Sequence, residues 1–448
     1  MRGLLSLVSA WLLCSASAHA SGSPNYLILL ADDVGLDLVT AYDEHPDPAR
    51  TPNIDRLAQG GILFRNAYAE PVCSASRAAL LTGRFGVRTG LGSNPTKNTA
   101  ANVGLRLAEV LLPELLGAGG YGSALCGKWH LADASQGANH PIDSGFDFAV
   151  GSLSNLTGQQ TYTRWLRTVN GVSRPSHAYA TTDAVDTAIR VIRHFEERQR
   201  PWFVLVGFNA PHHPLHAPPG HLHSYPLAGD PDATAPEHTR AMVEAMDTEI
   251  GRLFDGLGDA LDNTLVIFAG DNGSSAEATT PPFIPEHGKP TAFEGGINVP
   301  LIISGPTVAS PGRQVEGLVH LRDLYPTLAE MSGIPIQHRV DGISLVPHLD
   351  GSTPDSMLGS LRSWVYSEAF RPNVGSPGGG ASFRWRGARN SQGFKLLIHT
   401  QGLTDIFLFD LNTDPFETTN LLAGTLSPVQ QEAYDELTSL MTRVKALR

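Results

Sequence analysis

The chain has 448 residues, of which 41% are hydrophobic, and a formal net charge of -12 from 32 basic and 44 acidic side chains. An acidic chain repels other polyanions at long range, so we expect no nucleic-acid partner. Any anionic substrate has to be attracted by a local group of cations. The length suffices for one large core and a smaller domain.

Residues 1–20 have the pattern of a secretory signal peptide. Arg2 precedes an apolar run from Leu4 to Leu13, and Ala18-His19-Ala20 is a small-x-small cleavage site. The apolar run is too short to cross a bilayer, and no later segment is continuously apolar enough to do so. We therefore expect an exported protein, periplasmic or secreted, that has no membrane span and whose mature chain begins at residue 21.

The first strand is predicted at residues 26–30, an uninterrupted apolar run typical of a strand buried on both faces. Asp32 and Asp33 follow it directly. In open α/β sheets, ligands gather beyond the carboxyl ends of the strands, where these two carboxylates lie. Two acids after a strand are more often a solvated turn, so this pair alone is a weak indication of a site.

Residues 71–84 predict a helix that begins close to Cys73. Ser74 can cap its N-terminus, and Gly83 is suited to its C-terminus. Free N–H groups and the helix dipole attract anions at that end, and we expect them to lower the pKa of the Cys73 thiol. Arg77 lies four residues on, hence on the same face of the helix. Taken alone, such a pair is more often a buried thiol and a surface cation.

Two cysteines remain in the predicted mature chain, Cys73 and Cys126. In an exported protein a disulfide between them is the default expectation. That bridge cannot form if Cys73 is chemically modified. Cys126 lies at the end of an apolar run, and there we expect a buried structural thiol.

The next functional candidates follow a short strand predicted at residues 121–126, after a helix predicted at 105–116. Lys128 and His130 come at the carboxyl end of that strand, two residues apart, so on an extended segment both point the same way. A lysine and a histidine in such a place are more often surface residues. Residues 146–176, rich in glycine, serine, threonine and asparagine, are expected to form loops.

A helix is predicted at residues 182–199 and a buried strand at 202–208, which leads to His212. His213 and His216 lie close by in the sequence, and a histidine cluster suggests zinc. The ligand spacing of a structural zinc site is absent, however, and the acids at other strand ends favour a hard cation.

A second acidic strand end completes a candidate metal site. A helix is predicted at residues 237–257 and a buried strand at 264–269, and Asp271 and Asn272 follow that strand. Together with the acids after the first strand, they provide the all-oxygen set that Ca²⁺ prefers, with Mg²⁺ as the second choice. Lys289 follows in a loop and on its own would be a surface lysine.

Strands alternate with helices through residues 21–345, a pattern that predicts a doubly wound, mostly parallel α/β sheet flanked by helices. A further strand at 300–304 and a helix at 321–331 belong to the same domain. Residues 346–448 predict a smaller C-terminal α+β domain. It has hairpin character at 385–398, a strand at 407–411, and a closing helix that begins at Ser427-Pro428 and runs to about residue 447.

Six motifs, in order along the chain, resemble those of the sulfatase family. The most specific is Cys73-Ser74-Ala75-Ser76-Arg77, which resembles the family signature Cys-x-Pro-x-Arg, with Ala75 where proline is usual. The other matches are Ala31-Asp32-Asp33, Gly127-Lys128-Trp129-His130, Pro211-His212-His213-Pro214, Gly270-Asp271-Asn272-Gly273 and the stretch from Gly288-Lys289 to Glu294-Gly295-Gly296. Gly270 stands where the family has serine, at a position that is not a ligand.

The resemblance implies an arylsulfatase-like sulfuric ester hydrolase with the fold of the alkaline phosphatase superfamily. It implies that a maturation enzyme oxidises Cys73 to formylglycine, whose hydrate supplies the nucleophile for sulfur, and that Ca²⁺ activates it. The residues implied in binding the metal are Asp32, Asp33, Asp271 and Asn272. The implied catalytic residues are Arg77, Lys128 and Lys289 for the sulfate charge, His212 or Lys289 for the leaving alcohol, and His130 for the second hydroxyl of the hydrate.

Several alternatives stay open at this point. A phosphonate or phosphodiester hydrolase of the same superfamily would use nearly the same residues, and a non-catalytic binding protein could be built on the same fold. Ser152 or Ser154 could correspond to a family serine that contacts the sulfate. The sequence leaves open the sulfate ester, which could be aryl, sugar or other alkyl, the effect of Ala75 on maturation, and the oligomeric state.

Overall fold

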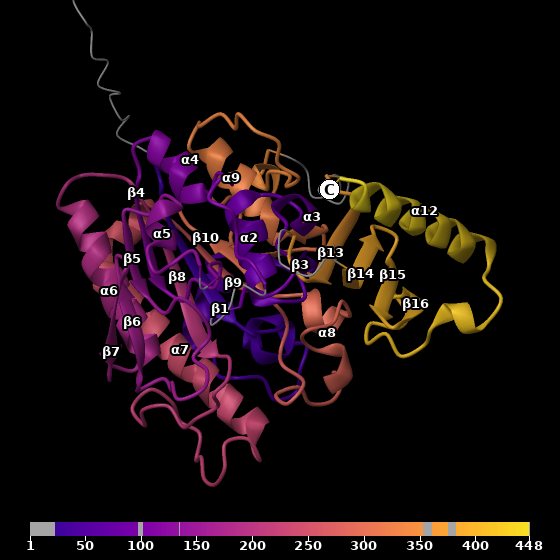
Figure 1. Ribbon diagram of the computed structural model, residues 1–448, viewed down its shortest axis with the longest axis horizontal. Coiled ribbons are helices and arrows are strands. Elements are labelled where there is room, and N and C mark those ends of the chain that lie inside the picture. The colour runs from indigo at the N-terminus through magenta and orange to yellow at the C-terminus, as the bar shows by residue number, and fades with distance from the viewer. Residues whose placement is uncertain (1–22, 97–101, 134, 353–360, 375–381, 448) are drawn as a thin grey trace, which may run out of the picture.

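The computed structural model describes residues 23–96, 102–133, 135–352, 361–374 and 382–447. Within these ranges, a ten-stranded sheet with helices on both sides forms the larger part of the molecule, and a four-stranded sheet lies at one end (Figure 1). The predicted signal peptide, residues 1–20, lies outside the described residues.

The large sheet is mixed, and its centre is parallel. The strand order is β11-β2-β10-β9-β1-β8-β4-β5-β6-β7, and the run from β9 to β5 is parallel throughout. The strands are β1 (Asn25–Asp32), β2 (Gly61–Phe64), β4 (Gly122–Gly127), β5 (Phe148–Gly151), β6 (Trp165–Val169), β7 (Val172–Ser176), β8 (Trp202–Pro211), β9 (Thr264–Gly270), β10 (Leu301–Ser304) and β11 (Arg313–Val315). This confirms the predicted doubly wound, mostly parallel sheet.

Helices cover both faces of this sheet, which explains the continuous apolar run of β1. Leu27 and Leu29 pack into one core cluster, whereas Tyr26, Ile28 and Leu30 pack into another on the opposite face. The first cluster includes residues of α1 (Pro52–Gln59), α6 (Ala180–Glu196) and α7 (Ala235–Leu257), and the second includes residues of α2 (Cys73–Thr82), α4 (Leu112–Ala118) and α9 (Leu324–Met331).

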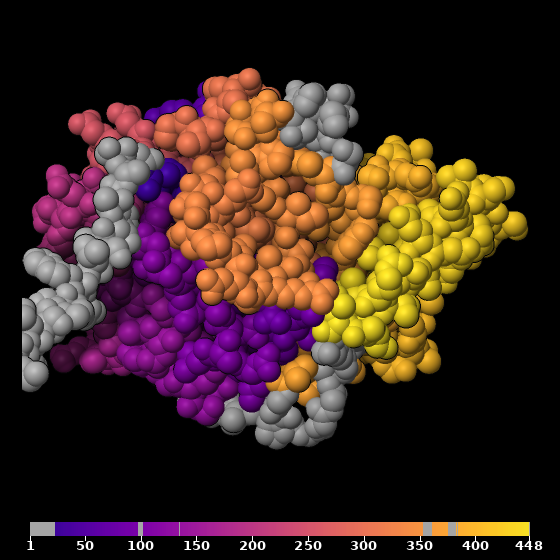
Figure 2. Space-filling view, turned by 90° about the horizontal axis from the view of Figure 1, so that it is seen from above, coloured from indigo at the N-terminus to yellow at the C-terminus, as the bar shows by residue number. Residues whose placement is uncertain are grey.

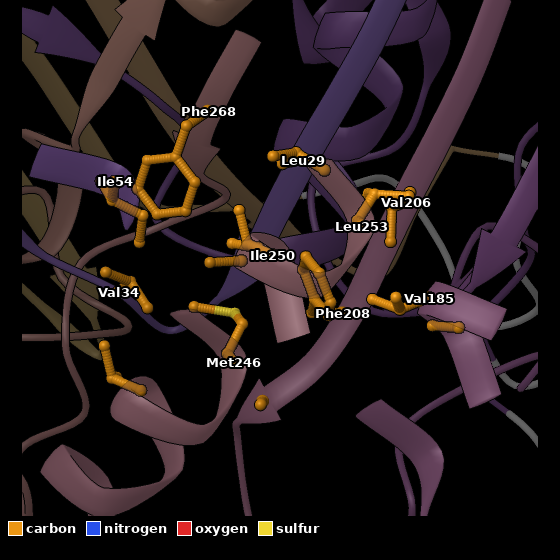
Figure 3. Close-up of a cluster of buried hydrophobic side chains, with 14 of the residues drawn as sticks. Leu29, Val34, Ile54, Val185, Val206, Phe208, Met246, Ile250, Leu253 and Phe268 are labelled. Atoms are coloured by element: carbon orange, nitrogen blue, oxygen red, sulfur yellow. The ribbon is translucent and has the colours of Figure 1, made fainter. Parts of the chain in front are cut away.

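Figure 3 shows the core between β1, β8 and α7. Leu29, Val206 and Phe208 point from the strands toward Met246 and Ile250 of α7, and all five side chains are completely buried. Truncating one such side chain to alanine costs about 2–5 kcal/mol because the surroundings close only part of the cavity. The packing holds the carboxyl ends of the central strands in place.

The smaller sheet is antiparallel, in the order β13-β14-β15-β16. Its strands are β13 (Trp364–Arg371), β14 (Ser382–Asn390), β15 (Phe394–Gln401) and β16 (Leu403–Asp410), and α12 (Pro428–Lys445) packs against them through Leu437, Met441 and Val444. Ser427 caps α12 by accepting a hydrogen bond from the N–H of Gln430, as its sequence predicts. The predicted boundary at residue 345 stays a prediction.

The remaining elements are short. They are β3 (Ala67–Tyr68), β12 (Val319–His320), α3 (Gly86–Thr89), α5 (His140–Asp143), α8 (Glu294–Ile297) and α10 (Val346–Leu349). In the space-filling view, the yellow C-terminal residues form one end of the molecule and adjoin the orange segments of the main part (Figure 2). Within the described residues, no helix is long and apolar enough to cross a membrane.

A buried acidic cluster joins the two parts of the molecule. Glu368 of β13 accepts a hydrogen bond from the N–H of Val87 at 2.7 Å, and its own N–H donates to Glu70 at 2.6 Å. Arg322 forms a 3.0 Å ion pair with Glu70. Burial raises the pKa of Glu70 to about 7, and burial together with the neighbouring Glu70 raises the pKa of Glu368 to about 8.

Two predicted segments are wrong. The helix expected at 105–116 begins only at Leu112, because Pro113 lies in its first turn, where a missing N–H leaves no hydrogen bond unmade. Residues 146–176 were expected to be loops but contain β5, β6 and β7. Four of the five residues of β7 are exposed, so this strand lacks the apolar alternation that marks a half-buried strand.

Candidate active site

Four neighbouring parallel strands bring the predicted residues to one edge of the sheet. β9, β1, β8 and β4 lie side by side in that order, and each is followed at its carboxyl end by one of the candidates. The register pairs Asp32 of β1 with Pro211 of β8, and Ala31 with Gly270 of β9. Asp271, His212 and Lys128 therefore come next to the end of β1, as expected for a ligand site in this type of sheet.

The helix α2 presents Cys73 to this edge. It begins at Cys73, and Gly83 ends it in a left-handed conformation with φ of 67°, as predicted. Ser74 is not the cap: Val72 holds the N-cap position, and the Ser74 hydroxyl donates instead to the carbonyl oxygen of His130 at 2.6 Å. That bond ties the first turn of α2 to the segment after β4.

The carboxylates and Cys73 form one cluster. One oxygen each of Asp32, Asp33 and Asp271 and the sulfur of Cys73 all lie within 4.8 Å of one another. Asn272 donates through Nδ2 to Asp33 at 2.8 Å, and its Oδ1 is buried without a hydrogen-bond partner, as is one oxygen of Asp32. Buried oxygens left without donors are suited to a hard cation, so these residues fit Ca²⁺ or Mg²⁺.

Three cations surround the same cluster. Arg77 donates to Asp271 through Nε at 2.9 Å and to the carbonyl oxygen of Lys128 at 3.0 Å. The ammonium group of Lys128 pairs with Asp32. Nζ of Lys289 lies 2.5 Å from Asp33 and 3.1 Å from the Cys73 sulfur. A tetrahedral dianion placed beside residue 73 would thus meet several fixed positive charges.

Burial and the neighbouring cations shift the pKa values of the carboxylates in this cluster in opposite directions. Burial tends to raise the pKa of Asp32, but Lys128 leads a group of cations that holds it well below the usual value. Burial and the charge of Asp32 raise the pKa of Asp271 to about 6. The two neighbouring carboxylates are therefore pushed in opposite directions, which a bound divalent cation would relieve.

The expected activation of the Cys73 thiol is wrong. Its side chain has no exposed surface, and this burial raises its pKa to about 12 although Lys128 and Lys289 favour the thiolate. A helix N-terminus lowers a thiol pKa only while the thiolate stays partly solvated, and here desolvation outweighs the dipole. As an unmodified thiol, Cys73 is a poor nucleophile.

Both candidate histidines face the cluster. Burial lowers the pKa of His130 and His212, and Asp32 is among the charges near each of them. Nδ1 of His130 is buried without a partner. His212 donates through Nδ1 to the carbonyl oxygen of His213 at 2.9 Å, and Nε2 lies 3.1 Å from the amide nitrogen of Asn155. Nδ1 of His130 therefore stays free to accept a proton, whereas both ring nitrogens of His212 already have a partner.

Two of the site residues adopt a left-handed backbone conformation that is unusual outside glycine. The φ angles are 71° for Asp33 and 65° for His130. Such a conformation costs of the order of 1 kcal/mol or more and persists where the surroundings fix it. Gly127, next to Lys128, has φ of 107°, and a Cβ atom there would lie 2.1 Å from the carbonyl oxygen of Gly207. The ends of β4 and β8 therefore approach one another closely.

The other histidines and serines lie elsewhere. His213 lies 4.0 Å from Asp232, and His216 contacts the Tyr179 hydroxyl at 3.1 Å, so neither joins His212 in a zinc site among the described residues. Ser152 bonds to Asn209, and Ser154 contacts only a neighbouring carbonyl. Asn155, which contacts His212, was missed because an asparagine in a polar loop carries no periodic signal.

The cluster opens into a cleft of about 780 Å³. Asp33, His212 and Lys289 line it on the side of the main sheet, and residues of β13, β14 and β15 line the other side. The cleft is far larger than a sulfate group, so it has room for the organic part of a substrate.

Two family models match consecutive parts of the chain. The sulfatase model matches residues 24–334, and the model of the C-terminal part of N-sulphoglucosamine sulphohydrolase matches residues 286–446. The chain belongs to the sulfatase family. This sulfatase is 33% identical to human N-acetylgalactosamine-6-sulfatase over 373 residues, covering 74% of this chain and 67% of the relative. It is 30% identical to bovine arylsulfatase A, covering 97% and 91% of the two chains.

A solved structure agrees with these relatives. The crystal structure of Ps i-CgsB in complex with k-i-k-neocarrahexaose superposes on this sulfatase with a TM-score of 0.78 at 26% identity, covering 94% of this chain and 93% of that one. The predicted family, fold and enzyme class are therefore confirmed. The individual site residues stay predictions, now with a geometry that brings all ten of them to one edge of the sheet.

Proposed function

We propose that this sulfatase hydrolyses sulfate esters of saccharides, using formylglycine made from Cys73 and a Ca²⁺ ion held by Asp32, Asp33, Asp271 and Asn272. The observation that carries the proposal is the position of Cys73, whose sulfur lies among three carboxylates and 3.1 Å from Lys289. When present, formylglycine supplies a hydroxyl nucleophile and calcium supplies charge for that hydroxyl and the sulfate.

The fixed cations bind the sulfate. Arg77 and Lys128 are both buried and both held by carboxylates of the cluster, so they need little reorganisation when the anionic sulfate ester arrives. Lys289 reaches both Asp33 and residue 73 and is therefore suited to hold a sulfate oxygen beside the reacting position. Local attraction by these groups overcomes the repulsion from an acidic chain of net charge -12.

The histidines and Lys289 move protons. His212 and Lys289 are the two candidates for protonating the leaving alcohol, because both line the cleft into which that alcohol departs. His130 is buried, and its Nδ1 has no hydrogen-bond partner. It is the candidate base that withdraws a proton from residue 73 after the alcohol has left. Asn155 holds Nε2 of His212 in place.

The saccharide part of the proposal rests on the relatives and on the cleft. One relative is named for N-acetylgalactosamine, and the structural neighbour holds an oligosaccharide. We further propose that the protein is exported after removal of residues 1–20 and that its partner is a formylglycine-installing maturation enzyme that accepts Ala75 in place of proline.

Mass spectrometry of the peptide containing residue 73, combined with turnover of p-nitrophenyl sulfate and N-acetylgalactosamine 6-sulfate, tests the proposal. We expect active protein to have lost the Cys73 sulfur and gained an aldehyde oxygen, and protein from a host without a maturation enzyme to be folded but nearly inactive. The Cys126→Ala variant is the matched control and should keep its activity, because Cys126 lies in β4 away from the cleft. Full activity with unmodified Cys73 would contradict the mechanism.

A phosphonate or phosphodiester hydrolase is the rival activity. Rates on p-nitrophenyl sulfate and on p-nitrophenyl phenylphosphonate share one leaving group and differ in the group transferred. A higher kcat/KM for the phosphonate would replace the proposed activity with the rival. Oxidised, metal-loaded protein that turns over neither ester nor the sugar sulfate would indicate a binding protein.

A further inference from the structure

The far wall of the cleft carries two arginines. Arg371, at the end of β13, and Arg384, in β14, line the cleft, and both side chains are exposed. Neither forms an ion pair with any residue in the described part of the chain. The acids that line the same cleft are Asp33, which pairs with Lys289, and the exposed Glu277. In a chain of net charge -12, two guanidiniums that have no ion-pair partner among the described residues, on the cleft wall opposite the reacting position, call for an explanation.

A β-bulge directs Arg384 to this wall. In the register of β13 and β14, Phe370 pairs with Phe383 and Ala369 pairs with Trp385, so Arg384 is an extra residue without a partner. Successive side chains of a regular strand point to opposite faces, yet Arg384 and Trp385 both line the cleft. Bulges turn a side chain in this way and occur often beside active sites.

Aromatic rings stand beside the arginines. The Trp385 and His399 rings, on paired residues of β14 and β15, stack with centroids 4.1 Å apart at an interplanar angle of 17°. The Phe293 and Trp385 rings pack at a steep angle, with centroids 5.5 Å apart and an interplanar angle of 65°. Trp385 is thus held in one orientation at the wall, and a fixed aromatic ring offers an apolar surface to the C–H face of a sugar.

We propose that Arg371 and Arg384 bind a second anionic group of the substrate, a sulfate or a carboxylate, while Trp385 packs against the sugar ring that carries it. This inference rests on the proposed saccharide sulfatase activity and narrows its substrate to polyanionic saccharides. Two guanidiniums match a sulfate or carboxylate through paired N–H donors, and neither has a carboxylate partner among the described residues to give up first. The C-terminal sheet then selects the substrate, and the main sheet carries out the reaction.

The test measures competitive inhibition of p-nitrophenyl sulfate turnover by a chondroitin 6-sulfate tetrasaccharide and by the same tetrasaccharide after desulfation. In the double variant Arg371→Gln/Arg384→Gln, we expect the Ki of the sulfated form to rise by roughly 10- to 100-fold, the loss typical of charged hydrogen bonds. The kcat/KM for p-nitrophenyl sulfate should change by less than about twofold, because this small ester does not reach the arginines. A loss confined to the sulfated form identifies sulfate as the second anion, and an equal loss for both forms identifies the carboxylate.

The control variant is Arg174→Gln/Arg198→Gln, which removes the same charge from exposed positions away from the cleft. Equal losses in the two double variants, or no inhibition of the wild type by either tetrasaccharide, would overturn the proposal. Trp385→Ala should weaken inhibition by both forms. Failure of the proposed function would give a different result, because protein oxidised at residue 73 would then turn over no sulfate ester. In that case, calorimetric binding of the tetrasaccharide to wild type and variants would still show whether the two arginines bind its second anionic group.

Discussion

The raised pKa of the buried Glu368 predicts that the stability of the folded protein depends on pH. Its pKa is about 8 in the folded protein, against an ordinary value of 4.5, because burial and the charge of Glu70 disfavour its ionised form. The folded state therefore keeps a proton that the unfolded state has lost, so stability is highest below about pH 4.5 and falls as pH rises through about 8. Above about pH 8, the contribution of the Glu368 proton to stability is completely lost.

The magnitude follows from the size of the shift. Between about pH 6 and pH 9, the contribution of Glu368 falls over the two units up to its pKa, at about 1.4 kcal/mol per unit, or about 3 kcal/mol in total. Glu368→Gln mimics the protonated form and keeps an oxygen for the N–H of Val87. We expect the variant to be more stable than the wild type by about 2 kcal/mol near pH 6, where the unfolded wild type has already lost the proton, and by about 5 kcal/mol near pH 9.

Urea unfolding followed by tryptophan fluorescence at the two pH values measures the difference. The carboxylates around Cys73 titrate in both proteins, so their effect on stability cancels from the comparison. Glu432→Gln, on the exposed side of α12, removes a carboxylate that makes no such contact and is the control. If wild type and Glu368→Gln lose stability equally between the two pH values, Glu368 is ionised in the folded protein and the reasoning is refuted.

Three further variants test the site and one helix. Asp271→Asn should lose bound calcium and activity together, as metal analysis and turnover will show; stoichiometric zinc in the wild type without calcium would contradict the metal assignment. His212→Ala should slow hydrolysis of a sugar sulfate by roughly 10²- to 10⁴-fold but that of p-nitrophenyl sulfate far less, because nitrophenolate leaves without a proton. Arg77→Ala should slow both alike, and equal losses for His212→Ala would leave Lys289 as the acid. Ser427→Ala should cost about 1 kcal/mol in urea unfolding through loss of the helix cap, and an unchanged midpoint would contradict that role.

The central strands could be predicted because both of their faces are buried. A short apolar run such as Tyr26–Leu30 is typical of a strand buried on both faces, and the polar residues that follow it mark the ligand edge. The direction of a strand cannot be predicted from its apolar pattern. Leu301–Ser304 is as apolar as the neighbouring strands but runs antiparallel to β9 and β2. The strands β6 and β7, at one end of the sheet, were missed since exposure removes the apolar pattern.

The site residues could be predicted from motifs, but their electrostatics could not. The effect of a helix N-terminus on Cys73 depends on how much water reaches the sulfur, and only the packed structure shows that none does. Likewise, the bulge at Arg384 depends on how two strands pair, which a single strand does not reveal. Asn155 contacts His212 across a loop and a strand end, and no local spacing connects them.

The burial of Cys73 also constrains the order of events in the cell. The side chain has no exposed surface, and its neighbour Ala75 is 2% exposed, both inside the first turns of α2. If another enzyme oxidises this cysteine, as proposed above, it can do so only while residues 73–77 are accessible, so this step would have to precede folding. Under that proposal, chains that fold first would be trapped as inactive protein, and only unfolding would return them to the maturation enzyme. The fraction of active molecules would then depend on the rate of Cys73 oxidation relative to the rate of folding. The stability of the folded protein does not affect this ratio.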